Sequence, residues 1–129
     1  MRKFENFGKA LENLKDIFSY EEPYSNVEMT GMVGLFEICF EQAWKAMKEI
    51  LEAAGYSESQ TGSPRQILKT AFAAGLIAEE GLWLEALTSR NNASHAYNQN
   101  VALQIIEKTK NVYYPMFQKF RQIAETSWM

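Results

Sequence analysis

The chain has 129 residues, 47% of them hydrophobic and 22% charged, and its net charge is −3. This length predicts a single domain over residues 1–129, with enough apolar side chains for a core that needs no disulfide. No apolar run approaches the roughly 20 residues of a membrane-spanning helix. Residues 1–10 carry charges throughout, unlike a signal peptide. We therefore expect a cytoplasmic protein that makes no use of a membrane.

The single cysteine and the single histidine limit the chemistry of one chain. Cys39 cannot form an internal disulfide, and one cysteine with one histidine cannot build a zinc site of the Cys/His type. Cys39 lies among apolar residues, which predicts a buried and unreactive thiol. We expect neither a metal ion nor a cofactor.

The first half of the chain predicts two helices separated by a turn at Pro23. From about Lys3 to Ser19, apolar residues recur at steps of three and four, the spacing of one helix face. They are Phe4, Phe7, Leu11, Leu14 and Phe18. After Pro23, Ser25 and Glu28 have the spacing of a capping box, which predicts the start of the second helix.

The second helix is the longest periodic segment, and it is predicted to end before Gly55, which suits the left-handed position after a helix. Its apolar residues follow a seven-residue rhythm and are predicted to face the core. They are Val33, Phe36, Phe40, Ala43 or Trp44, Met47, and Ile50 or Leu51. We expect the opposite side, with its charged residues, to face solvent. That side carries Glu37, Glu41, Lys45, Lys48 and Glu52.

A third helix is predicted after a polar connection over residues 55–62. Ser63 has the character of an N-cap, followed by Pro64 in the first turn and Gln66 at the third position. Gly75 is predicted to end the helix. The residues predicted to form its buried face are Ile67, Leu68, Ala71 and Phe72.

A fourth helix is predicted from about Glu79 to Arg90. It should end or loosen there, because the short polar side chains that follow compete with the backbone for hydrogen bonds. These are Asn91, Asn92 and Ser94. The last helical segment begins near Asn98, and Pro115 must kink or restart it. No segment alternates with the period of a strand, so we expect an all-α fold, an up-and-down antiparallel bundle of four to six helices.

The stretch from Arg90 to Tyr97 carries the chemically distinctive residues. It contains the only histidine, His95, and Arg90 is the only residue with a permanent charge between Ala86 and Ile106. Arginine binds phosphate through a planar fork, and histidine moves protons near neutral pH. The pair suits metal-independent cleavage of a phosphodiester. In that reaction, His95 would take the proton of a ribose 2′-hydroxyl and Arg90 would stabilise the developing charge.

Helix geometry restricts how this pair could work. On one regular helix, side chains five residues apart differ by about 140° in direction, so Arg90 and His95 would not converge. Either the backbone unwinds between them, or a symmetric dimer combines residues of two chains. Structural roles are also open: His95 as a cap or an exposed residue, and Arg90 bound to the carbonyls that close its own helix.

The run Arg90-Asn91-x-x-x-His95-x-Tyr97 resembles the signature of the HEPN superfamily. It is most similar to the branch of nucleotidyltransferase substrate-binding proteins, also called HepT-like. The resemblance extends over most of the chain. It includes Gly62-Ser63-Pro64-Arg65, Ala71-Phe72, Gly75-Leu76-Ile77, Trp83, and the acidic helix that contains Glu41 and Trp44.

The resemblance implies a helical bundle that forms homodimers and pairs with a small nucleotidyltransferase encoded nearby, in a two-gene system of the toxin–antitoxin type. It implies that Arg90 and His95, with Asn91 as the accompanying polar residue, form a metal-independent ribonuclease site. In some members the motif tyrosine, here Tyr97, receives AMP from the partner enzyme. Two alternatives remain open: a non-catalytic module that presents a nucleotide or substrate, and a helical interaction protein with neither role.

The charge distribution bears on these partners. Residues 1–60 contain 6 basic and 11 acidic residues, a net charge of −5, whereas residues 61–129 contain 7 and 5, a net charge of +2. An acidic chain is not a typical RNA binder, because phosphate contacts supply most nonspecific affinity. RNA or a nucleotide is therefore expected at the less acidic half, which holds Arg90, and a partner protein at the acidic half.

Overall fold

The computed structural model describes residues 1–56 and 62–129, and helices make up most of both ranges. The α-helices are α1 (Arg2–Leu14), α2 (Asn26–Ala53), α3 (Pro64–Ala73), α4 (Glu80–Asn92), α5 (Gln99–Lys108) and α6 (Tyr114–Ser127). Short 3₁₀ turns follow α1 (Lys15–Ser19) and α4 (Ala93–His95), and a π-helical turn (Thr109–Tyr113) joins α5 to α6. No strand occurs in the two described ranges. Most of the predicted polar connection, residues 57–61, lies outside them.

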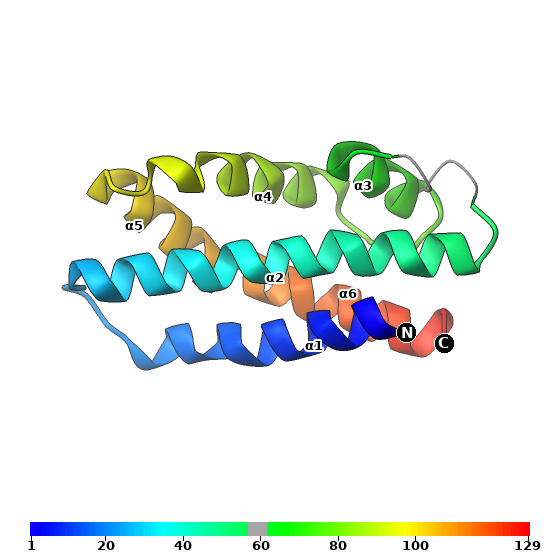
Figure 1. Ribbon diagram of the computed structural model, residues 1–129, viewed down its shortest axis with the longest axis horizontal. Helices are drawn as coiled ribbons and strands as arrows, with labels where there is room; N and C mark the ends of the chain where they lie inside the picture. The colour runs from blue at the N-terminus through cyan, green and yellow to red at the C-terminus, as the bar shows by residue number, and fades with distance from the viewer. Residues whose placement is uncertain (57–61) are drawn as a thin grey trace.

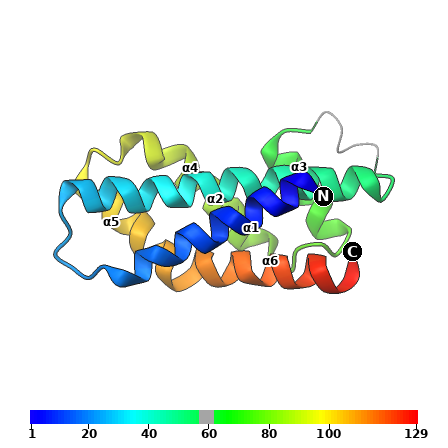
Figure 2. The same ribbon diagram turned by 60° about the horizontal axis from the view of Figure 1, so that its bottom comes forward.

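The long helices lie side by side and alternate in direction (Figure 1). Helix α1 leads away from the end where both termini lie, α2 returns to that end, α4 leads away again, and α5 and α6 return. Figure 2 shows the same order from another side, with the short α3 beside the end of α2. This arrangement confirms the all-α bundle predicted from the sequence.

Side-chain caps begin two of the helices where the sequence predicted them. The Ser25 Oγ accepts the Glu28 N–H at 3.1 Å, and the Ser25 N–H donates to the Glu28 carboxylate at 2.8 Å, which completes the capping box of α2. The Ser63 Oγ accepts the Gln66 N–H at 3.3 Å, at the start of α3. Each cap contributes about 1 kcal/mol.

Glycines end the same two helices, also as predicted. Gly55 follows α2 with a φ of 93°, and Gly75 follows α3 with a φ of 84°. A residue with a Cβ is strained in this left-handed region, which explains the choice of glycine. Pro115 sits in the first turn of α6, directly after the π-helical turn, so the predicted restart of the last helix is confirmed.

Aromatic side chains from four helices form the centre of the core. Trp83 of α4 contacts Phe40 of α2, with ring centroids 6.2 Å apart, and Phe117 of α6, at 5.4 Å. Phe7 of α1 also contacts Phe117, at 6.1 Å. Burying one such side chain contributes roughly 1.5–3 kcal/mol. The cluster therefore holds α4 against α2 and fixes the position of the residues at the end of α4.

The predicted core face of α2 is confirmed, and so is the burial of its cysteine. Val33, Phe36, Phe40 and Met47 are buried; Ala43 is buried as well, and Trp44 is half-buried. Cys39 is fully buried, and desolvation raises the pKa of its thiol well above the usual range. The thiol therefore stays protonated at neutral pH, and protonated thiols are poor nucleophiles.

Two residues predicted to be buried are exposed. Phe18 is 47% exposed, because the chain tightens into a 3₁₀ turn after Leu14 and the side chains rotate away from the face of α1. The Phe18 ring packs edge-on against Tyr114 instead, with centroids 5.1 Å apart. Phe72 is 43% exposed, because α3 is short and buries only Ile67, Leu68 and Ala71 against the bundle.

Candidate functional site

The stretch from Arg90 to Tyr97 covers the end of α4 and the connection to α5. Helix α4 ends at Asn92, as predicted, and a 3₁₀ turn follows. The Asn98 Oδ1 then accepts the backbone N–H groups of Asn100 and Val101, at 2.9 and 3.4 Å, and so begins α5. The stretch lies at the end of the bundle opposite the termini (Figure 1).

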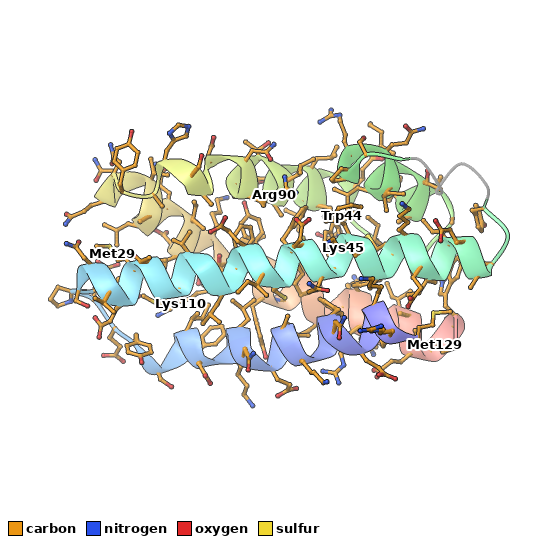
Figure 3. All side chains as sticks on the ribbon, viewed as in Figure 1. Met29, Trp44, Lys45, Arg90, Lys110 and Met129 are labelled. Carbon is orange, nitrogen blue, oxygen red and sulfur yellow. The ribbon has the colours of Figure 1, made fainter. Side chains whose placement is uncertain are left out.

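The Arg90 side chain is directed inward, toward α2. Its Nη2 donates to Glu41 Oε2 at 2.9 Å and its Nη1 to Asn91 Oδ1 at 3.0 Å. The guanidinium carbon lies 6.0 Å from the centroid of the Phe40 ring, within cation–π distance. Figure 3 shows Arg90 between α4 and α2, in the region of Trp44 and Lys45. Side chains, and not the carbonyls of its own helix, are thus the hydrogen-bond partners of Arg90.

Glu41 is the residue of this site that the sequence reasoning assigned wrongly. It was expected on the solvated side of α2, but its side chain is only 33% exposed and forms an ion pair with Arg90 and a longer one with Lys45, at 3.9 Å. Partial burial raises the pKa of Glu41, but hydrogen bonding to Arg90 and Trp44 and the charges of Arg90 and Lys45 outweigh it. The net effect is a lowered pKa.

The indole N–H of Trp44 lies close to Glu41 but forms no well-aligned hydrogen bond with it. Its Nε1 is buried and has no hydrogen bond of good geometry among the described residues, although its proximity contributes to the lowered pKa of Glu41. We therefore regard the Trp44 N–H as close to the Glu41 carboxylate but poorly aligned with it. Arg90, in contrast, forms a hydrogen-bonded ion pair with Glu41, a carboxylate that it shares with the more distant Lys45.

His95 and Tyr97 face solvent. Tyr97 is 86% exposed, and the two rings meet edge-on with centroids 6.3 Å apart. Within the described ranges, no hydrogen bond or ion pair reaches either side chain. The structure thus brings Arg90 together with Asn91 and His95 together with Tyr97, but no hydrogen bond or ion pair within the described ranges joins the first pair to the second.

Glu41 could not be found from helix periodicity, because its partner Arg90 is 49 residues away in the sequence. The only signal in the sequence was the family pattern that includes Glu41 and Trp44. The described residues contain no group of three or more side chains of metal-ligating type. No helix in these ranges is long and apolar enough to cross a membrane.

Two comparisons with known proteins found matches that cover most of the chain. A family model described as nucleotidyltransferase substrate binding protein like matches residues 2–125. A crystal structure of a protein from Thermus thermophilus is similar with a TM-score of 0.71 and 28% sequence identity, and the alignment covers 92% of this chain and 95% of that chain. A search of curated proteins gave no match.

Proposed function

The chain belongs to the family of nucleotidyltransferase substrate binding protein-like proteins, and on this premise we propose that it is the helical partner of a small nucleotidyltransferase encoded nearby. Within the family we assign it to the HepT-like branch of the HEPN superfamily, in a two-gene system of the toxin–antitoxin type. The match over residues 2–125 is the observation that carries this proposal. The acidic residues 1–60 are the proposed contact with the transferase.

The exposed end of the bundle favours Tyr97 as a target of the transferase. At 86% exposure and without a hydrogen bond to any described residue, its hydroxyl is open to another enzyme. In the proposed reaction, the Tyr97 oxygen attacks the α-phosphorus of ATP. A P–O bond forms, pyrophosphate leaves, and the phenolic proton passes to solvent or to a base of the transferase.

Mass spectrometry tests this modification. We expect the intact mass to rise by one AMP when chain, transferase, ATP and Mg²⁺ are incubated together, and no rise with Tyr97→Phe. Tyr20→Phe is the matched control, because Tyr20 is also exposed, at 43%. An unchanged mass, or an equal rise in Tyr97→Phe, contradicts the assignment.

We further propose that Arg90, Asn91 and His95 form a ribonuclease site that is completed in a homodimer. In each chain Arg90 is bound to Glu41 and His95 is exposed, which supports a site assembled from residues of two copies. His95 then takes the 2′-hydroxyl proton, the 2′-oxygen attacks phosphorus, and the bond to the 5′-oxygen breaks as that oxygen takes a proton from water. The products are a cyclic phosphate and a 5′-hydroxyl end.

Cleavage of RNA by the purified dimer in the presence of a chelator tests this site. Arg90→Ala and His95→Ala should each abolish cleavage and any growth inhibition. Arg121→Ala is the matched control, since Arg121 also forms ion pairs with glutamates, but on α1 and α6. Cleavage that survives in both site variants rules out a role for this site.

The pairing of Arg90 with Glu41 favours one alternative, a non-catalytic module that presents a nucleotide or substrate to the transferase. Because Arg90 already donates to Glu41 and Asn91, it would offer a ligand its remaining N–H groups and not a free cation. This alternative predicts no RNA cleavage, but saturable nucleotide binding that weakens with Arg90→Ala. Binding without cleavage would select it over the ribonuclease.

A further inference from the structure

A groove of about 480 Å³, here called the α4–α5 groove, lies between these two helices and is lined by both polar and apolar side chains. Its volume is within the range of small-molecule sites. The residues that matter for its chemistry are Glu85, Ser89, Gln104, Glu107, Lys108 and Tyr113. Successive residues of an α-helix differ by about 100° in direction, so Ser89 and Arg90 point to different sides of α4. The groove is therefore separate from the Glu41–Arg90 pair.

A hydrogen-bond network holds one wall of the groove in place. The hydroxyls of Ser89 and Tyr113 are 2.8 Å apart, the Tyr113 hydroxyl donates to Glu85 Oε1 at 3.3 Å, and Lys108 Nζ lies 2.9 Å from the same oxygen. The Tyr113 ring is buried and stacks on Phe36 with centroids 5.3 Å apart. Burial raises the pKa of the Tyr113 phenol, and the Glu85 charge raises it further. The phenol therefore remains a donor at neutral pH.

Other polar side chains of the groove have donors and acceptors that no described residue uses. The side chains of Asn92, Gln104 and Glu107 line it and form no hydrogen bond or ion pair within residues 1–56 and 62–129. Together they offer amide donors and acceptors and a carboxylate acceptor. A ligand with several hydroxyl groups could accept from the amide donors and donate to the amide and carboxylate acceptors at the same time.

The charge of the groove restricts the ligand. Lys108 is matched by Glu85, and Glu107 leaves an excess of one negative charge. A phosphate or carboxylate would be repelled there, whereas a neutral or positively charged molecule would not. Val101 and Ile105 add an apolar surface at the wall formed by α5, which suits the C–H face of a sugar ring.

We propose that the α4–α5 groove is a second binding site, for a neutral or positively charged small molecule of the sugar or polyol class. The observations that carry it are the preformed Ser89–Tyr113–Glu85–Lys108 network, the unpaired amides and carboxylate beside it, and the negative charge. The site does not depend on pairing with a transferase, so either proposal can fail without the other.

Titration of the full-length, ¹⁵N-labelled chain tests the site, with methyl glucoside, glucosamine and glucose 6-phosphate as probes. We expect millimolar binding of the first two, with shifts at the amides of Ser89, Gln104 and Lys108. Loss of one hydrogen bond in Gln104→Ala should weaken binding about fivefold. Gln122→Ala makes the same chemical change on α6, outside the groove, and should have no effect.

Gln104→Ala tests binding without disturbing the fold, because the Gln104 side chain has no hydrogen-bond partner among the described residues. Ser89→Ala adds a second variant, whose fold is checked by thermal unfolding. The proposal is overturned if none of the probes shifts these amides, if glucose 6-phosphate binds more tightly than the uncharged glucoside, or if Gln104→Ala and Gln122→Ala behave alike.

Discussion

The ion pair between Glu41 and Arg90 should connect α2 to α4 with a measurable energy. At 2.9 Å, the Coulomb attraction would be about 6 kcal/mol at an effective dielectric constant of 20. The side chains are 33% and 29% exposed, and solvent contact and lost side-chain entropy reduce the net value to about 1 kcal/mol. We therefore expect a coupling of about 1 kcal/mol at pH 7 between Glu41→Gln and Arg90→Gln.

The pH dependence of this coupling follows from the lowered pKa of Glu41. A carboxyl group with a lowered pKa in the folded state stabilises the fold above its unfolded pKa of about 4.3. This contribution is lost as the pH falls through the lower folded pKa. Urea unfolding measures this coupling free energy. The wild type, both single variants and the double variant are compared between pH 7 and about pH 2.

The pair formed by Lys119 and Glu79 is the matched control. Its atoms are 4.0 Å apart and both side chains are more than half exposed, so its coupling should be close to zero. A coupling for Glu41 and Arg90 that is no larger than this control would refute the reasoning. So would a coupling that persists unchanged in acid.

Three substitutions and one labelling experiment have defined outcomes. Gly81→Ala should raise the free energy of unfolding by about 1 kcal/mol, because its Cβ would meet nothing within 4 Å in α4; a loss would contradict this. Gly75→Ala should lower it by about 1–2 kcal/mol, because φ is +84° there. Ser25→Ala should cost about 1 kcal/mol in urea unfolding. Cys39 should react with a thiol reagent only after unfolding; rapid reaction in the native chain would show that it is accessible.

Local signals in the sequence were sufficient for most helix boundaries. Ser25 and Ser63 begin helices, and Gly55 and Gly75 end them, because caps and left-handed positions depend on a few adjacent residues. Periodicity failed where the local geometry changed. Phe18 follows a switch to a 3₁₀ turn, which no pattern of apolar residues indicates.

The candidate site could be predicted only in part, because its contacts join distant segments. The stretch from Arg90 to Tyr97 was found from its composition, and the end of α4 within it from the short polar residues. The pairing of Arg90 with Glu41 depends on how α4 packs against α2, which hydrophobic patterns do not specify. The network of Ser89 and Tyr113 spans 24 residues and was missed for the same reason.

Co-expression with the small nucleotidyltransferase that we propose as its partner tests the central proposal most directly. We expect the two proteins to co-elute in size-exclusion chromatography, and light scattering to give a mass that exceeds that of either protein alone. Charge reversal at acidic positions of α2, outside the Glu41–Arg90 pair, should weaken the complex. If the chain elutes at the same volume with and without the transferase, and no transferase is retained by the tagged chain, the proposed partnership is wrong.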